Sequence, residues 1–178
     1  MTILDFFKDA SNLKNISRQG WIDKLSIIHP ESVADHSYSM SIMAMIISDL
    51  ENYDSEKILK MVLLHDLAES KIGDFTPGQI SKDEKEKIEN QAFHEIIENL
   101  PTRISSEYAE IWKEYQNQIS VESQIVHQID RLEMALQAKL YQKSGSSEED
   151  IATFLETAKS DIIHPKLQQL FRKIIEDN

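Results

Sequence analysis

Hydrophobic residues recur along most of the chain at intervals of three and four positions, with polar residues between them. This spacing puts the hydrophobic side chains on one side of an α-helix, whereas a half-buried strand needs strict alternation, so it predicts an almost entirely helical chain. Pro, Gly and small polar clusters divide the pattern into about eight helices. Their approximate ranges are 2–13, 31–50, 55–72, 82–99, 103–118, 120–143, 147–160 and 165–176.

The stretch between the first two of these ranges is less regular. Residues 17–30 contain the sequence RQGW and end at Pro30, and we count no helix in them. No internal repeat and no low-complexity linker interrupts the chain, so we expect residues 1–178 to form a single domain. A domain of this length buries roughly 70% of the surface that its unfolded chain exposes, which is enough for a substantial core.

Composition agrees with a helical globular protein. Hydrophobic residues make up 40% and charged residues 28% of the chain, and it has only four Gly and four Pro, fewer than a turn-rich β protein needs. The chain has no Cys, which excludes disulfides, zinc–thiolate sites and cysteine nucleophiles. This usage is compatible with the reducing cytoplasm, and a cytoplasmic location is what we expect.

The chain is strongly acidic, with 31 Asp and Glu against 19 Lys and Arg and a formal net charge of −12. Such a surface repels nucleic-acid backbones and anionic membranes, so we expect neither as a partner. No hydrophobic run approaches the ~20 residues needed to span a bilayer, and the first residues do not resemble a signal peptide. A small phosphorylated substrate remains compatible with this charge, because a bound metal and one or two basic residues reverse the sign locally.

The sequence LLHDLAESKIGD, residues 63–74, places a cluster of charged residues directly after a hydrophobic helical run. Its residues His65, Asp66 and Glu69 are of types that bind metals or transfer protons. If the helix continues through them, Glu69 is i+4 from His65 and i+3 from Asp66, so the three side chains share one face. A polar helix end without chemistry is the alternative that this segment alone leaves open.

Two further residues are unusual for the positions that they occupy. His36 lies among the hydrophobic residues of range 31–50, where a hydrogen-bonded core histidine is more common than a metal ligand. Asp130 lies on the hydrophobic stripe of range 120–143, where a carboxylate is costly unless it is paired or binds a cation. Arg131 is the alternative partner for this carboxylate, although it points about 100° away around the helix.

Together, His36, His65, Asp66 and Asp130 make a set of two nitrogen and two oxygen ligands for one divalent ion. Because it contains no thiolate, the set favours an octahedral ion such as Mn, Co, Fe, Ni or Mg over structural zinc, and Zn is kept among the candidates. Glu122, eight residues before Asp130, either supports this site or caps its helix.

Five segments, in their order along the chain, resemble one family. They are RQGW, HPESVADHSYSM, LLHDLAESKIGD, QIDRLEMALQA and IIHPKL. The pattern of His36, then His65 and Asp66, then Asp130 is similar to the H…HD…D signature of the HD-domain metal-dependent phosphohydrolases. The five segments together resemble the HD-domain 5'-deoxynucleotidases, especially their eukaryotic and archaeal members. The resemblance covers about residues 13–170.

This resemblance implies an HD-domain helical bundle with a single metal site in its core cleft. The implied reaction is the hydrolysis of a deoxyribonucleoside 5'-monophosphate to the deoxynucleoside and phosphate, by an enzyme that commonly forms homodimers. The metal ligands of the family match His36, His65, Asp66 and Asp130, so the resemblance implies the same four ligands for one divalent cation here.

The resemblance also implies roles for four other residues. Glu69 takes the place beside the attacking water, as general base or orienting group, and Asp74 matches the acid that contacts a sugar hydroxyl. Arg18 resembles the arginine that orients the phosphate, and Trp21 is a candidate for the wall against the 2' position of the sugar. The bacterial enzymes have tryptophan directly after the arginine, whereas RQGW puts Trp21 three positions later.

Two other functions have to be weighed against this one. HD-domain phosphodiesterases and pyrophosphohydrolases act on other nucleotides, and those that take larger ones are expected to have more basic residues near the site. A non-catalytic HD interaction module is expected to have a broken ligand set, whereas this chain keeps all four ligands and Glu69. We therefore favour a phosphomonoesterase, in which a metal polarises the phosphate and acidifies a bound water while Arg18 neutralises phosphate charge.

Overall fold

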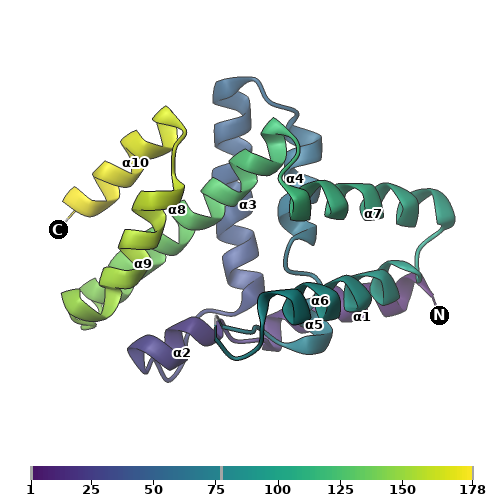
Figure 1. Ribbon diagram of the computed structural model, residues 1–178, viewed down its shortest axis with the longest axis horizontal. Coiled ribbons are helices and arrows are strands. Elements are labelled where there is room, and N and C mark those ends of the chain that lie inside the picture. The colour runs from purple at the N-terminus through teal and green to yellow at the C-terminus, as the bar shows by residue number, and fades with distance from the viewer. Residues whose placement is uncertain (1, 77, 178) are drawn as a thin grey trace.

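The computed structural model describes residues 2–76 and 78–177, which form helices joined by short loops (Figure 1). The α-helices are α1 Ile3–Asn12, α2 Gln19–Leu25, α3 Val33–Glu51, α4 Ser55–Leu64, α5 Glu69–Ile72, α6 Lys82–Ile97, α7 Thr102–Asn117, α8 Val121–Lys143, α9 Glu148–Asp161 and α10 Pro165–Glu176, and Leu13–Asn15 forms a 3-10 helix, η1. Over the described residues there is no sheet, and only an isolated bridge pairs Ser17 with Ser32. The prediction of an all-α fold is confirmed.

The prediction of about eight helices missed two short ones. Helix α2 lies in the stretch that the sequence left irregular, and α5 is separated from α4 by a turn. The first amide of α2, the N–H of Gln19, donates a hydrogen bond of 2.8 Å to Asp74 Oδ2. Because this cap comes from a residue 55 positions away, no local pattern in the sequence could have indicated where α2 begins.

Helix α8 is the centre of the fold, and in Figure 1 it crosses the middle of the molecule. It packs against α3, α4, α7, α9 and α10. Its buried side chains include Ile125, Val126, Ile129, Leu132 and Ala135. Full burial of a side chain such as Ile129 contributes about 1.5–3 kcal/mol to folding, so this helix is both the main part of the core and a rigid support for polar side chains.

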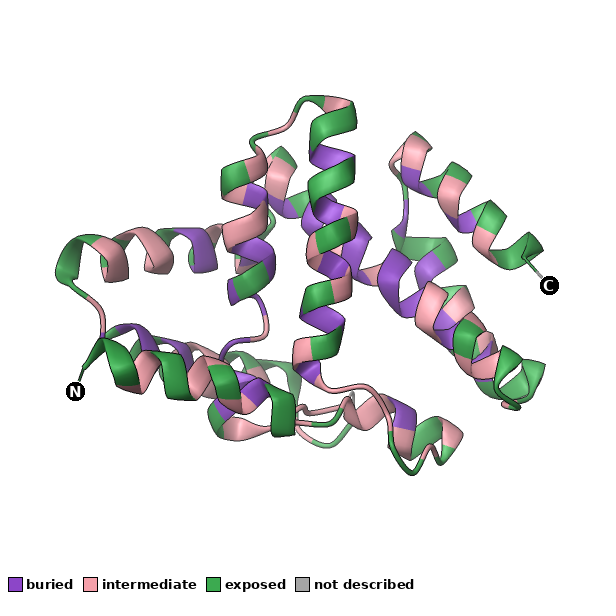
Figure 2. Cartoon of the chain, turned by 180° about the vertical axis from the view of Figure 1, so that it is seen from behind, coloured by how far each residue is buried: buried purple, intermediate pink, exposed green. Residues whose placement is uncertain are grey.

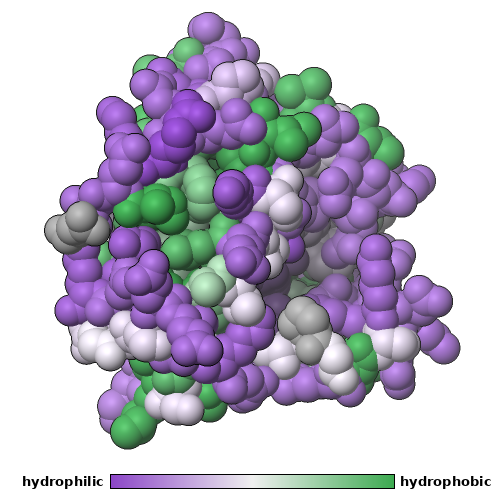
Figure 3. All heavy atoms as spheres, turned by 60° about the vertical axis from the view of Figure 1, so that its left-hand side comes forward, coloured by the Kyte–Doolittle hydropathy of each residue, from purple (hydrophilic) through white to green (hydrophobic). Residues whose placement is uncertain are grey.

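The exposed faces of the helices are polar. Figure 2 shows the buried residues on the sides of the helices that face one another, with exposed residues on the outer sides. On the face shown in Figure 3, hydrophilic residues predominate and hydrophobic residues are visible in a hollow near its middle. Within the described part of the chain, no helix combines the length and the apolar composition needed to cross a membrane.

The segment before α2 is attached to the start of α3. The N–H of Val33 donates to the carbonyl of Ile16 over 2.8 Å, and the N–H of Arg18 donates to the carbonyl of Glu31 over 3.0 Å. Ser32 caps α3, since its Oγ accepts a hydrogen bond from the N–H of Asp35. This arrangement brings Arg18 beside the first turns of α3.

Candidate metal centre and active site

Two buried histidines face each other at the end of α4 and near the start of α3. The Nδ1 atom of His36 lies 2.6 Å from Glu133 Oε2, and the Nδ1 atom of His65 lies 2.6 Å from the carbonyl oxygen of Val62. If each ring carries a hydrogen on Nδ1, that N–H has an acceptor, and Nε2 is the nitrogen that can offer a lone pair to a metal. Neither Nε2 atom has a hydrogen-bond partner among the described residues, although both are buried.

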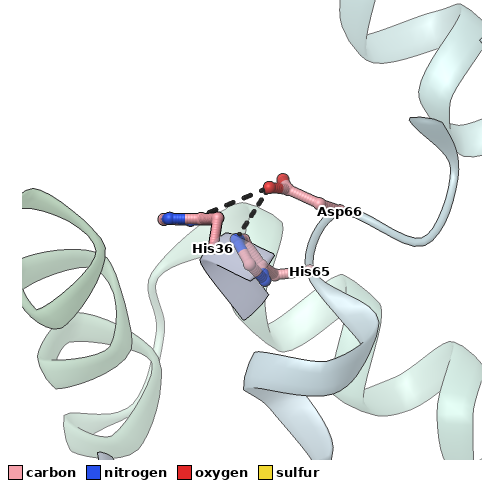
Figure 4. Close-up of side chains that lie close together, drawn as sticks. All are labelled: His36, His65 and Asp66. Atoms are coloured by element: carbon pink, nitrogen blue, oxygen red, sulfur yellow. Dashed lines mark ion pairs between the residues drawn. The ribbon is translucent and has the colours of Figure 1, made fainter. Parts of the chain in front are cut away.

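Carboxylates approach these two nitrogen atoms closely. Asp66 Oδ2 lies 3.0 Å from His65 Nε2 and 4.0 Å from His36 Nε2, and Asp130 Oδ1 lies 3.3 Å from His36 Nε2. Dashed lines in Figure 4 join Asp66 to the two histidines. One ligand atom each from His36, His65 and Asp66 can be chosen so that all lie within 4.8 Å of one another. The atoms are close but not aligned as hydrogen bonds, which is the arrangement expected of ligands directed at a shared cation. The donor set fits a divalent metal ion.

The turn at residues 65–68 explains how His65 and Asp66 reach this position. Helix α4 ends at Leu64, and the next hydrogen bonds join residues three apart, from Leu67 N to Leu64 O and from Glu69 N to Asp66 O. With three residues per turn, the side chains of Asp66 and Glu69 are nearly eclipsed. The expected continuous helix through these residues is thus wrong, although the turn also brings Asp66 and Glu69 to one side.

His65 itself contributes to ending α4. Its ring is hydrogen-bonded to the carbonyl of Val62, one of the last carbonyls of the helix, which have no partner within the helix. The same bond orients the ring so that Nε2 points to Asp66. The local structure of the helix end and the geometry of the site therefore depend on one hydrogen bond.

The site holds an excess of negative charge. Burial, followed by Arg18, lowers the pKa of His36, but the neighbouring carboxylates of Asp130 and Glu133 outweigh both and raise it to about 9. Burial acts to raise the pKa of both aspartates, but contacts with His65 and Arg18 hold the pKa of Asp66 far below its usual range, and contacts with His36 and Arg131 do the same for Asp130. A group of acids that draws a proton onto a buried imidazole also favours a metal cation in its place.

A cavity of about 400 Å³ opens above this cluster, a size that accommodates a small ligand. Its lining includes seven of the residues predicted to form the site: Arg18, Trp21, His65, Asp66, Glu69, Asp74 and Asp130. His36, which has no exposed surface, lies below the cavity floor. The guanidinium of Arg18 contacts Asp66 Oδ2 at 3.2 Å. Burial acts to lower the pKa of Arg18, but the surrounding carboxylates raise it above its usual value, so Arg18 is cationic.

The other predicted residues lie on the cavity wall in different environments. Glu69 is buried, and burial followed by repulsion from Asp66 and Asp74 raises its pKa well above the usual range. Its Oε2 has no hydrogen-bond partner in the part of the chain that the structure describes. Trp21 is almost fully buried, and its indole N–H donates to Glu31 Oε1 over 2.8 Å. Only a small part of the indole therefore reaches the cavity.

Several residues at the site were not indicated by the sequence analysis. Glu133 had a usable signal, because it is a carboxylate on the same hydrophobic helix as Asp130 and three residues after it. Lys85, Glu89, Tyr115 and Phe154 line the cavity from three other helices, and ordinary charged or aromatic residues carry no local sign of such a position. The suggestion that Glu122 supports the site or caps its helix is wrong. It pairs with Lys57 at 3.5 Å, and Ser120 caps α8.

An all-helical fold with a buried histidine–carboxylate cluster at the floor of a cavity defines a class of protein. The chain belongs to the HD-domain family, because the family model described as HD domain matches residues 10–171. The predicted family resemblance is confirmed.

Individual relatives show which HD-domain proteins this chain is similar to. The 5'-deoxynucleotidase HDDC2 of Homo sapiens is 34% identical over 174 residues, which are 97% of this chain and 84% of that protein. The 5'-deoxynucleotidase HDDC2 of Dictyostelium discoideum is 35% identical over 185 residues, covering 98% of this chain and 97% of that protein. A protein from Pyrococcus horikoshii of known structure superposes with a TM-score of 0.79 at 30% identity, covering 96% of this chain and 97% of that chain.

Proposed function

We propose that this protein is a metal-dependent 5'-deoxynucleotidase, which hydrolyses a deoxyribonucleoside 5'-monophosphate to the deoxynucleoside and phosphate. The observation that carries the proposal is the convergence of two unpartnered imidazole nitrogens and two carboxylates below a cavity that also holds Arg18 and Glu69. Relatives with this activity in their names match nearly the whole chain, which supports the same substrate class. We propose that residues 1–178 act as one domain, since the family match spans most of them.

Four residues would hold one divalent ion, namely His36, His65, Asp66 and Asp130. When bound, such an ion polarises a phosphate ester and lowers the pKa of a coordinated water. Two imidazoles and two carboxylates suit Mn, Co, Fe, Ni or Mg better than a structural zinc, and catalytic Zn remains in the set to be tested.

Arg18 would bind the phosphate group of the substrate. Its guanidinium is cationic and already lies 3.2 Å from Asp66, so it reaches the edge of the proposed metal centre. A guanidinium can donate two parallel hydrogen bonds to phosphate oxygens, which neutralises charge on the phosphate and fixes its orientation.

Glu69 would act as the general base. A base must be deprotonated at the working pH and must have a free oxygen within reach of the water. The pKa of Glu69 is raised by its burial, which makes its carboxylate a better proton acceptor than an ordinary glutamate, and its Oε2 carries no other bond from the described residues. Asp66 and Glu69 lie on the same side of the turn, so the base is next to a ligand.

The sugar would lie against the wall formed by Asp74 and Trp21. Asp74 lines the cavity and uses Oδ2 to accept the N–H of Gln19, which leaves its other oxygen for a sugar hydroxyl. The exposed part of Trp21 would pack close to the 2' position, where a ribose hydroxyl would have no room.

A phosphate-release screen tests this function. The purified protein is incubated with deoxyribonucleoside and ribonucleoside 5'-monophosphates, cyclic nucleotides and pyrophosphorylated nucleotides, each with Mn, Co, Fe, Ni, Mg or Zn. We expect metal-dependent phosphate release that is largest for the deoxyribonucleoside monophosphates. Hydrolysis of a cyclic or pyrophosphorylated nucleotide with no release from monophosphates would replace the proposal with one of the other HD-domain activities.

We also propose that the enzyme works as a homodimer in the cytoplasm. Tyr38, Ile42, Met45 and Ile46 are exposed on α3 at helical spacing, so they form one hydrophobic stripe. Helix α3 stands in the middle of the face shown in Figure 2, with exposed residues along it. A second copy of this stripe is a matching partner, because two-fold interfaces bring the same surface of each subunit together.

Cytoplasmic fractionation of the tagged protein tests the location.

A further inference from the structure

Glu133 is a buried carboxylate that the roles proposed above do not use. It lies on α8, one helical turn after Asp130, and is 2% exposed. A carboxylate at such a position destabilises the fold unless it is paired or hydrogen-bonded. Its Oε2 lies 2.6 Å from Nδ1 of His36, the short distance typical of a hydrogen bond that involves a charged group.

A second carboxylate lies in the same cluster but has a different partner. Glu31, Glu133 and His36 each offer one ligand atom, and these atoms lie within 4.8 Å of one another. Glu31 Oε1 accepts the indole N–H of Trp21 over 2.8 Å, whereas the hydrogen bond to His36 comes from Glu133. The two acids therefore have different roles, since Glu31 orients Trp21 and Glu133 orients His36.

We propose that Glu133 is a positioning residue for the metal centre, whose carboxylate holds the proton of His36 on Nδ1 and so directs the Nε2 lone pair at the cation. A neutral imidazole carries one N–H and one lone pair, and a fixed acceptor at Nδ1 decides which nitrogen is which. His65 obtains the same arrangement from the carbonyl of Val62. Glu133 differs because it adds a negative charge, which makes the imidazole a stronger ligand. This inference rests on the proposed function, of which the metal centre is part.

Cobalt binding to the metal-free protein tests the role without any substrate. We expect Glu133→Gln to raise the Kd for Co²⁺ about 10-fold, because the amide still accepts a hydrogen bond but carries no charge. Glu133→Met, which removes the acceptor, should raise it about 100-fold, the upper end of the effect of such partners. The absorption bands of bound Co²⁺ should also change in both variants, and saturating metal should restore most of kcat.

Two controls separate positioning from general effects. Glu122→Gln makes the same chemical change on the same helix, at a residue paired with Lys57, and should leave the Kd for Co²⁺ unchanged. Burial, followed by Glu133, raises the pKa of Glu31 to about 7. Glu31→Gln removes this acid from the same cluster without removing the bond to His36, so it should have a smaller effect than Glu133→Gln.

The outcomes are distinct. Wild-type Kd values and spectra in both Glu133 variants would overturn the inference, as would an equal loss in Glu31→Gln. Thermal unfolding of the metal-free variants checks that they are folded, and if Glu133→Met does not fold, the Gln variant decides alone. If Co²⁺ binding weakens in the Glu133 variants but the wild-type protein releases no phosphate from deoxynucleotides, the proposed substrate is wrong and this inference still holds.

Discussion

The two carboxylate oxygens of Asp130 have different neighbours. Oδ1 faces His36 Nε2 at 3.3 Å, and Oδ2 lies 3.2 Å from Nη1 of Arg131. Arg131 in turn contacts Asp161 at 3.1 Å near the surface. A cation and Arg131 are therefore not exclusive partners for this buried acid, since Oδ2 contacts Arg131 while Oδ1 faces the proposed metal centre.

At this position we predict that Asp130→Ala abolishes metal binding and phosphate release together, because it removes one of four ligands. Metal analysis after dialysis against excess Mn²⁺, together with the phosphate assay, measures both. The matched control is Asp161→Ala, which breaks only the outer contact of Arg131 and should keep metal content and activity within about twofold. Full turnover in Asp130→Ala would contradict the ligand assignment.

A second residue-scale prediction concerns pH. Glu69 accepts a proton only when it is deprotonated, and burial together with Asp66 and Asp74 raises its pKa. We therefore expect kcat/KM to fall as the pH drops through this raised pKa, at a higher pH than the usual value of about 4.3 for glutamate would give. Glu69→Gln should lower kcat about 10²- to 10⁴-fold at all pH values, with its metal content retained.

Glu89 provides the comparison for this prediction. It also lines the cavity, and burial raises its pKa too. We expect Glu89→Gln to keep the acid limb of the pH profile, because Glu89 is not the proposed base. If the acid limb of the pH profile disappears in Glu89→Gln but persists in a Glu69→Gln variant that is still active, the general base is Glu89 and not Glu69.

Among the elements, short and irregular segments position more of the site than long helices do. The turn at residues 65–68 presents His65 and Asp66, and α5 follows directly with Glu69. Helix α5 ends at Ile72, and its C-cap residue Gly73 has φ 80° and ψ 170°, a conformation almost restricted to glycine. Asp74 follows at once, so this glycine sets the direction in which the proposed sugar contact enters the cavity.

We predict that Gly73→Ala lowers the free energy of unfolding by about 1–3 kcal/mol and raises KM more than it lowers kcat. A Cβ here would meet nothing within 4 Å, so the cost comes from the backbone conformation and not from a clash. Urea denaturation and steady-state kinetics measure the two effects. Gly145→Ala is the control, since Gly145 also has positive φ and free space but lies between α8 and α9. It should lose stability with KM unchanged.

At the scale of the whole molecule, the oligomeric state tests whether the hydrophobic stripe on α3 forms the proposed dimer interface. We predict that Ile42→Glu converts a dimer to a monomer, because the two-fold axis brings the new charge and its copy on the second subunit into one interface, where they repel each other. Light scattering after size-exclusion chromatography measures the mass. Ile119→Glu introduces the same charge at another exposed isoleucine, in the middle of the α7–α8 connection, and should leave the dimer intact. A monomeric wild-type protein would contradict the proposal.

The sequence by itself determined the helical class, the family and the residue types of the candidate site. Helical periodicity is a local property, and a carboxylate such as Asp130 on a hydrophobic stripe is anomalous wherever the helix lies. Glu133 is also a carboxylate on this stripe, so the sequence contained enough information to predict it as a site residue.

Only the tertiary structure decided how these residues meet. The first amide of helix α2 donates to Asp74, a residue 55 positions away, and such a cap is not visible in a local pattern. The partner of His36 lies 97 positions away, and the cavity wall comes from several helices. Hydrogen bonds between distant residues depend on the packing of whole helices, so their partners could be identified only from the folded chain.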